Sequence, residues 1–403
     1  MKDNKSIILT FTGDILSTRS QNKRAYIGKG KYDFSSYFSK LKYFFKESDY
    51  VIGSLETPIA GKGAKYTDSE TCFNTPDEFL KALKNVGFKM LTTATNHCLD
   101  RGIKGLYRTI NQLDKIGLDH TGTFIDNNDS NFLLKDFEGI KVAFISYTYG
   151  TNSASNGCLL KSNEEVLVNL TRKQDSIPKR SIIKNTFLGF FGMLPYSFRQ
   201  RIRPYSTSIS IDSVKPTEIE LSHNKKYTDG IKTCINSAKQ KADIVIFCLH
   251  SGGQFNSEIG EYTSYLVDLI SSLGVDAIIG NHTHTVLPIK NINGCHIAYS
   301  LGNFAFSPKE QPYIDGVYAD YSIALDLIID KESKSISQIN YRVLKNITPK
   351  EGLTEVVPVY DLYVNEQNEK VKEDIEQDIK QVIRRFIDRP LSEIMVERKY
   401  KYL

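Results

Sequence analysis

Short apolar, β-branched runs alternate along the chain with stretches of helical periodicity, and this alternation constrains the fold more than any other feature. The runs, each bounded by turn-forming residues, are SIILTFTG, YVIGS, KMLTTAT, KVAFISY, DIVIFCL, VDAIIG and HIAYS. Their length and their ends are typical of buried strands in an α/β sheet. Between several of them, residues 75–87, 103–117 and 261–274 place apolar side chains on one helical stripe and end in glycine. We therefore predict a layered α/β domain over about residues 5–308.

Two segments depart from this alternation. Residues 160–225 form an insertion within the domain, and its part 172–203 has an apolar, aromatic centre between Lys and Arg flanks. Two interpretations stay open: a helical insertion that packs on the domain, or an interfacial segment in peripheral contact with an anionic membrane. Residues 309–403 follow as a C-terminal extension, in which we expect a β-hairpin with DKESKS as its turn and then a charged, solvated helix.

Composition narrows the class of protein. A chain of 403 residues with 40% hydrophobic and 25% charged residues is ordinary for a globular protein, and a net charge of +5 is too small to indicate a nucleic-acid partner. The apolar stretch near the start is too short for a signal segment, and no run reaches the roughly 18 residues of a spanning helix. The six scattered cysteines indicate reduced thiols. We expect a cytoplasmic location, peripheral to the inner face of the membrane if the insertion is interfacial.

Ligand-type side chains follow the predicted strands at their carboxyl ends, and they are Asp14, Glu56, Asn96 with His97, His250, and His282 with His284. Because the carboxyl ends of neighbouring strands in an open α/β sheet face one crevice, we expect these side chains to gather there. Each alone has a simpler explanation, such as a turn, a helix cap, a surface position or a core hydrogen bond. Four of the seven histidines share this placement, two of them in an HxH pair, which favours a shared site.

Carboxylates and imidazoles together are typical of a site for two divalent ions. These ligands suit zinc, manganese or iron, and a carboxylate can bridge two ions. Such a pair could activate a water and hold both the attacking and the leaving oxygen of a phosphoryl displacement. His120 and His223 lack the strand-end placement, and His296 lies at the opposite end of its strand from the crevice, so we leave these three out.

Six sequence blocks, taken in order, resemble the CapA family of bacterial capsule or poly-γ-glutamate biosynthesis proteins. The blocks span roughly residues 6–308 and are FTGDI, GSLETPI, TTATNHCLDRG, LHSGGQF, IIGNHTHTV and YSLGNFAFS. The resemblance implies the fold of the calcineurin-like metallophosphoesterases, a four-layer β-sandwich flanked by helices. It also implies a role in capsule or cell-envelope polymer biosynthesis, with an anionic polymer or a phosphorylated envelope intermediate as ligand and capsule-assembly proteins as partners.

The resemblance further implies which residues would hold the two metal ions. The first ion would be held by Asp14 and His284, the second by Asn96, His250 and His282, and Glu56 would bridge both.

The resemblance assigns the reaction itself to His97, which would protonate the leaving oxygen after attack by a metal-bound hydroxide. Asp100 would orient the His97 imidazole. Two further assignments concern the substrate, and each has an alternative. Arg19 could contact a phosphate or be an exposed cation, and Asn303 could line the site or belong to a tight turn.

The chain also departs from the family's pattern. Leu16 stands where phosphoesterases carry a first-block histidine, so one metal position is short of a ligand, and Ser54, Ser251, Gln254 and Asn281 replace other family residues. Three functions therefore stay open: a metal-dependent phosphoesterase, a non-hydrolytic biosynthetic component, and an anionic-polymer binding module with a degraded metal site. No Walker loop is present, so ATP-dependent ligation would need a separate partner.

Overall fold

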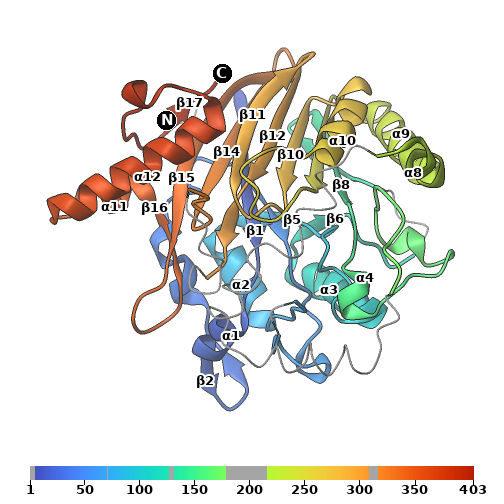
Figure 1. Cartoon of the computed structure of the whole chain (residues 1–403), viewed down its shortest axis with the longest axis horizontal. Coiled ribbons are helices and arrows are strands. Elements are labelled where there is room, and N and C mark those ends of the chain that lie inside the picture. The colour runs from blue at the N-terminus through green and yellow to red at the C-terminus, as the bar shows by residue number, and fades with distance from the viewer. Residues whose placement is uncertain (1–4, 70, 127–130, 178–215, 308–315) are drawn as a thin grey trace.

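The structure is a computed structural model that describes residues 5–69, 71–126, 131–177, 216–307 and 316–403 (Figure 1). Its largest sheet has nine strands, in the order β16-β15-β14-β1-β4-β5-β6, with β13 beside β1 and β17 beside β15. These strands are β1 (Ser6–Ile15), β4 (Tyr50–Leu55), β5 (Phe88–Thr92), β6 (Asp119–Thr121), β13 (Asn303–Ala305), β14 (Tyr321–Asp330), β15 (Ser335–Ile347), β16 (Glu355–Pro358) and β17 (Tyr400–Lys401).

A second sheet has six strands, in the order β11-β12-β10-β9-β8-β7. They are β7 (Leu133–Phe137), β8 (Ile140–Thr148), β9 (Ile244–His250), β10 (Ala277–Asn281), β11 (Val286–Ile292) and β12 (Cys295–Leu301), and a separate small ribbon joins β2 (Tyr26–Gly28) to β3 (Lys31–Tyr32). The two large sheets pack on each other through one apolar core, in which the rings of Phe11 and Phe144 lie 6.4 Å apart. Both contain parallel central strands, which brings the carboxyl ends of β1, β4, β9 and β10 to one region.

Helices cover the outer faces of the sheets. Helices α9 (Lys225–Lys239) and α10 (Glu261–Ser272) pack on the six-stranded sheet, while η1 (Ser35–Leu41) and α2 (Asp77–Val86) pack on the nine-stranded one. The other helices of the described residues are α1 (Arg19–Ala25), η2 (Lys62–Ala64), α3 (Gly102–Ile116), α4 (Ser153–Asn156), η3 (Glu165–Leu167), α8 (Glu218–His223), α11 (Val359–Asn365), α12 (Glu369–Ile387) and η5 (Leu391–Glu393). The predicted α/β class is confirmed, and so are the three helices predicted within residues 75–87, 103–117 and 261–274.

The C-terminal extension contains the predicted hairpin and helix. Strands β14 and β15 pair antiparallel, and β14 also pairs with β1, so the extension shares a sheet with the rest of the chain. The prediction that the C-terminal helix, α12, is solvated is wrong for one of its faces. Its apolar residues recur at helical spacing and are buried in the core, namely Ile375, Ile379, Val382, Ile383 and Phe386. The division at residue 308 stays a prediction.

The membrane interpretation of residues 172–203 falls largely outside the described residues, which resume at residue 216 before α8. Among the helices that the structure does describe, none combines the length and the apolar character needed to cross a bilayer. No disulfide joins any of the six cysteines in the structure, and the predicted reduced state of the thiols stays a prediction.

Candidate metal centre

The predicted ligand-type side chains meet in one buried cluster. Asp14 lies near the end of β1 and His250 at the end of β9, while the others follow β4, β5 and β10. Almost no surface of these residues is exposed: 0% for Asp14, Glu56 and Asn96, 1% for His282, 3% for His250 and 5% for His97 and His284. Their common position at the carboxyl ends of strands therefore brings these seven residues, from both sheets, to one place.

Glu56 lies at the centre of the cluster, between two groups of ligand-type atoms. Its Oε1 is 3.4 Å from His250 Nε2 and 3.8 Å from His282 Nδ1, and its Oε2 is 3.8 Å from His284 Nδ1. On the second side, Asp14 Oδ2 is 3.7 Å from the same His284 nitrogen. The trios Glu56–His250–His282 and Asp14–Glu56–His284 each offer one ligand atom per residue within 4.8 Å of one another.

Asn96 belongs to the same side of the cluster as His250. Its side-chain oxygen is 2.8 Å from His250 Nε2, and its side-chain nitrogen has no hydrogen-bond partner among the described residues. An amide oxygen beside an imidazole of the cluster is a further hard ligand for a cation bound there.

Several buried polar atoms of the cluster have no hydrogen-bond partner within the described part of the chain. They are Asp14 Oδ1, both side-chain oxygens of Glu56, His250 Nδ1 and His282 Nδ1. Leaving charged oxygens buried and unpaired costs several kcal/mol each, roughly, and a bound cation removes that cost. The donor set therefore fits a divalent metal ion.

The electrostatics of the cluster agree with this fit. Burial and the neighbouring Glu56 charge raise the pKa of Asp14 well above its ordinary value. Burial also opposes the charge on Glu56, but three nearby histidines, His284 first, hold the pKa of Glu56 well below its usual range. Burial lowers the pKa of His282 to about 3 and also lowers the pKa of His250. These two rings are neutral at pH 7 and keep a lone pair for a cation.

The turn after β10 explains how two histidines one residue apart reach one cluster. His282 and His284 have φ values of 100° and 59°, in a region of backbone conformation that residues other than glycine rarely adopt. The backbone N–H of His282 donates to Asp14 Oδ2 at 2.8 Å, which holds the turn against the carboxylate. Backbone strain of this kind costs on the order of 1–3 kcal/mol per residue and is typical of functional sites.

Asn303 fixes the ring of His284. Its side-chain nitrogen donates to the carbonyls of His284, at 3.0 Å, and Ala319, at 3.1 Å, so its oxygen is the atom that faces His284 Nδ1 at 2.8 Å. An amide oxygen only accepts, and this contact therefore places the ring proton on Nδ1. The nitrogen of His284 that can bind a cation is then Nε2, not the Nδ1 from which the two distances above are measured. The structure thus places Asn303 at the cluster, fully buried.

His97 lies beside the cluster with the predicted partner. Its Nδ1 is 2.7 Å from Asp100 Oδ2, an oxygen that also accepts the backbone N–H of Phe73 at 2.7 Å. Burial opposes a charge on His97, but the Asp100 carboxylate raises the pKa of the imidazole above its ordinary value overall. Sequence reasoning missed Asn152, whose side-chain nitrogen is 3.4 Å from His97 Nε2. Asn152 follows the end of β8, which is the predicted strand KVAFISY. A search for polar side chains after that strand would have found it.

Arg19 lies away from the cluster, whereas Leu16 lies beside it, against aromatic rings that contact His97 and His284. Arg19 is exposed at the first position of α1, and the contacts of the described residues do not join it to the cluster. Leu16 is 1% exposed and packs with Phe73 and Phe306. The position of the missing first-block histidine is therefore apolar.

Fold and cluster together define an α/β protein with a buried carboxylate–histidine centre that can hold a metal ion. The chain belongs to the family described as bacterial capsule synthesis protein PGA_cap, which matches residues 8–308. This family is part of the metallophosphoesterase-like superfamily, so the resemblance predicted from the six blocks is confirmed.

Two curated relatives carry matching names. The chain is 27% identical over 300 residues to the PGA biosynthesis protein CapA of Bacillus subtilis (strain 168), a match that covers 74% of this chain and 62% of that protein. It is 23% identical over 309 residues to the capsule biosynthesis protein CapA of Bacillus anthracis, covering 76% and 61%. The chain therefore spans less than two thirds of the length of either relative.

Likenesses to solved structures are weak. A hypothetical protein from Thermus thermophilus matches with a TM-score of 0.36 and 10% identity, over 87% of this chain and 98% of that one. The protein titled GAP50, the anchor in the inner membrane complex of Plasmodium, matches with a TM-score of 0.31 and 13% identity, over 97% and 100%. Scores this low carry no argument about this chain.

Proposed function

We propose that the chain is a metal-dependent, phosphoesterase-like protein that acts in the biosynthesis of a capsule, of poly-γ-glutamate or of another cell-envelope polymer. One observation carries the proposal: two carboxylates and three histidines bury their ligand atoms together, and several of those atoms have no protein partner among the described residues. The family and the names of the two relatives support the biological role. The arrangement of two packed sheets with outer helices supports the four-layer sandwich of the superfamily.

The ligand set supports a centre for two ions of manganese, zinc or iron. Glu56 contributes one oxygen to each side, with Asp14 and His284 on one side and Asn96, His250 and His282 on the other. When bound, such ions lower the pKa of a water molecule and neutralise charge on a phosphoryl group.

The chain's own residues supply the proton and its control. Asp100 raises the pKa of His97 and so favours its protonated form, in which Nε2, on the ring edge away from Asp100, would donate to a leaving oxygen. Asp100 is itself held by the Phe73 N–H, so the imidazole keeps one orientation through the reaction. Burial of the whole cluster excludes water and so strengthens the contacts of Asp100 with His97 and with the Phe73 N–H.

A second candidate is a binding role in capsule assembly without hydrolysis. The apolar surroundings of Leu16 favour it, because the first metal position has one ligand fewer than a phosphoesterase carries. In either case the ligand would be an anionic polymer or a phosphorylated envelope intermediate, handled together with other capsule-assembly proteins.

The two candidates are separated by kinetics on the reconstituted protein with bis-p-nitrophenyl phosphate as the probe. A phosphoesterase hydrolyses it in the presence of Mn²⁺, loses that activity with Glu56→Gln, and keeps it with the control His296→Ala, whose side chain contacts Asn291 outside the cluster. If the wild type retains Mn²⁺ but hydrolyses neither this diester nor p-nitrophenyl phosphate, the binding role replaces the hydrolase.

A further inference from the structure

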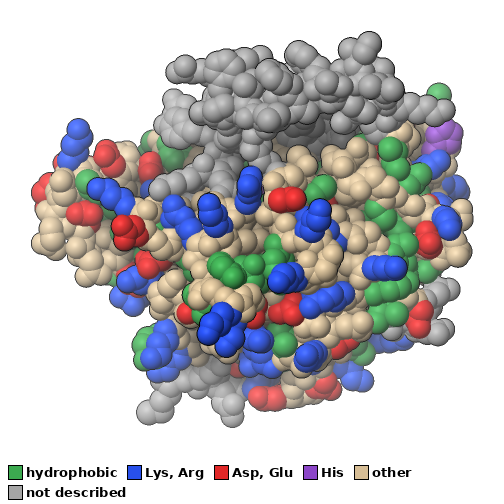
Figure 2. Space-filling model, turned by 90° about the horizontal axis from the view of Figure 1, so that it is seen from below, with side chains coloured by type: hydrophobic (Ala, Val, Ile, Leu, Met, Phe, Trp, Pro, Cys, Tyr) green, Lys and Arg blue, Asp and Glu red, His purple; other side chains and the backbone are tan. Residues whose placement is uncertain are grey.

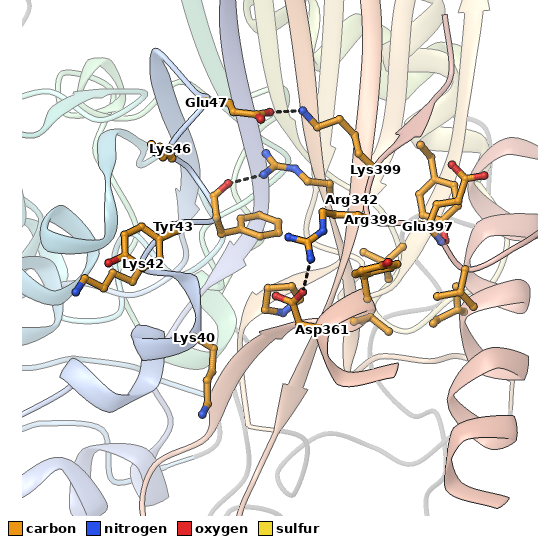
Figure 3. A pocket seen from close by; sticks show the side chains of 18 of the residues that line it. Lys40, Lys42, Tyr43, Lys46, Glu47, Arg342, Asp361, Glu397, Arg398 and Lys399 are labelled. Atoms are coloured by element: carbon orange, nitrogen blue, oxygen red, sulfur yellow. Dashed lines mark hydrogen bonds and ion pairs between the residues drawn. The ribbon is translucent and has the colours of Figure 1, made fainter. Parts of the chain in front are cut away.

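A pocket of about 890 Å³ opens between residues 39–47 and the C-terminal extension (Figure 3). We call it the basic pocket. Its walls come from the end of η1 and the residues that follow it, from the β16–α11 junction, and from residues 396–400 with neighbouring parts of β15 and α12. A volume of this size is in the range of proven ligand sites, roughly 300–1,000 Å³. None of its residues belongs to the metal cluster.

The basic pocket reaches toward the opposite end of β4 from the cluster. Lys46 and Glu47 line the pocket and precede Tyr50, the first residue of β4, whereas Glu56 follows the last residue of that strand. A strand of six residues spans about 20 Å. A ligand seated beside Lys46 is therefore too far from the cluster to share its atoms.

Positive charge is in excess in this pocket. Six basic and three acidic side chains line it. Three of the basic groups have carboxylate partners: Lys399 pairs with Glu47, Arg398 with Asp361 and Arg342 with Asp326. Among the described residues, Lys40, Lys42 and Lys46 have no ion-pair partner, although the Lys42 ammonium lies 5.2 Å from the centre of the Tyr43 ring. These three lysines share one rim of the pocket (Figure 3).

Apolar side chains line the pocket between these charged groups, and we call them its floor. Val343, Val359 and Tyr400 are at most 6% exposed, and Tyr43 adds a ring with 71% of its surface exposed. A basic rim beside an apolar floor fits a ligand that carries anionic groups separated by short hydrocarbon stretches. A compact inorganic anion would leave the floor unused.

We propose that the basic pocket binds a segment of an acidic polymer whose repeat carries one carboxylate and a short methylene stretch, as in a γ-linked glutamate chain. The choice of a carboxylate polymer rests on the proposed capsule function, whereas the position and charge of the pocket are independent of it. The pocket would hold the chain about one strand length away from the metal cluster, and would do so whether or not the cluster hydrolyses anything.

The test compares two charge-matched triple variants in an anisotropy titration with fluorescent poly-γ-glutamate. The first is Lys40→Ala, Lys42→Ala and Lys46→Ala, and the second is Lys81→Ala, Lys104→Ala and Lys115→Ala, which removes exposed lysines of α2 and α3. The matched control is needed because Lys and Arg side chains are also spread over other parts of the surface (Figure 2). All six lysines are exposed, so both variants should fold, and the thermal midpoint checks this.

We expect the pocket variant to bind at least tenfold more weakly than the wild type and the control variant to stay within twofold. Polyphosphate of matched charge should bind several-fold more weakly than the carboxylate chain, because it has no methylenes for the apolar floor. Equal losses in both triple variants, no binding by the wild type, or polyphosphate binding as tight as that of the carboxylate chain would each overturn the proposal. A wild type without diesterase activity that still binds the polymer through these lysines would overturn only the proposed hydrolysis.

Discussion

At the scale of single residues, the histidines of the site divide into two chemical states. Burial lowers the pKa of His282 and His250 and outweighs the opposite effect of the nearby Glu56 carboxylate. His97 is just as deeply placed, but Asp100 raises its pKa. The first two rings are suited to donate a lone pair to a cation, and the third is suited to carry a proton.

This division predicts that His97→Gln lowers kcat without releasing metal. Removing a general acid costs about 10²–10⁴-fold in rate. Kinetics and metal analysis on the same preparation check this, with the exposed His223→Gln as control. A variant that loses metal in proportion to its activity would show that His97 is a ligand instead.

Asn303→Ala should weaken metal binding although Asn303 is not among the predicted metal ligands. It removes the acceptor at His284 Nδ1 and the donor to two buried carbonyls. We expect about 10–100-fold lower metal affinity and a loss of about 1–3 kcal/mol in the free energy of unfolding. Competition with a chelating dye measures the first and urea unfolding the second, with Asn291→Ala at the protein surface as control. Unchanged affinity with lowered stability would limit Asn303 to a role in folding.

At the scale of elements, the sequence predicts most strands and helices because their signals are local. The apolar runs suffice to predict the strands β1, β4 and β9, and the helical spacing with a final glycine suffices to predict the helices α2 and α3. The buried face of α12 was readable from its spaced apolar residues but was hidden by the surrounding charge. The turn at His282 and His284 could not be predicted, because an HxH spacing carries no information about φ.

The close packing of β10 and β12 predicts a large effect of one added methyl group. A Cβ at Gly280 would collide with the backbone carbonyl of Tyr299, whereas a Cβ at Gly230 in α9 would meet open space. Gly280→Ala should therefore lower the free energy of unfolding by about 1–3 kcal/mol. Gly230→Ala should raise it by about 0.5–1 kcal/mol, as helix propensity dictates. Urea denaturation of both variants measures the two changes in the free energy of unfolding. Similar changes at the two positions would contradict the close packing of β10 on β12.

At the scale of the whole molecule, the extension completes the sheet that carries Asp14. Strand β14 pairs with β1 from Ser6↔Asp330 to Phe11↔Leu325, and α12 closes the same core. The hairpin was predictable from its turn, but its partner strand was not, since that pairing joins residues more than 300 positions apart. The ligand-type side chains of the six blocks meet in one cluster because strand-end placement is a property of the topology.

Removing the extension should therefore unfold the domain. A chain ending at residue 308 exposes the edge of β1 and the apolar core beneath α12, and we expect it to be insoluble or to lack a cooperative thermal transition. Circular dichroism of the truncated chain checks this. A soluble, cooperatively folding fragment would instead establish residue 308 as a domain boundary.

The proposed function requires the buried cluster to be a metal centre with Glu56 shared between its two sides. The most direct test is the metal content of the purified chain after loading with Mn²⁺ or Zn²⁺ and exhaustive dialysis. We predict tightly bound metal in the wild type, up to two ions per chain with the position beside Leu16 the weaker, and near-complete loss of both in Glu56→Gln. A wild type that retains no metal, or a Glu56→Gln variant that retains as much as the wild type, would contradict the account.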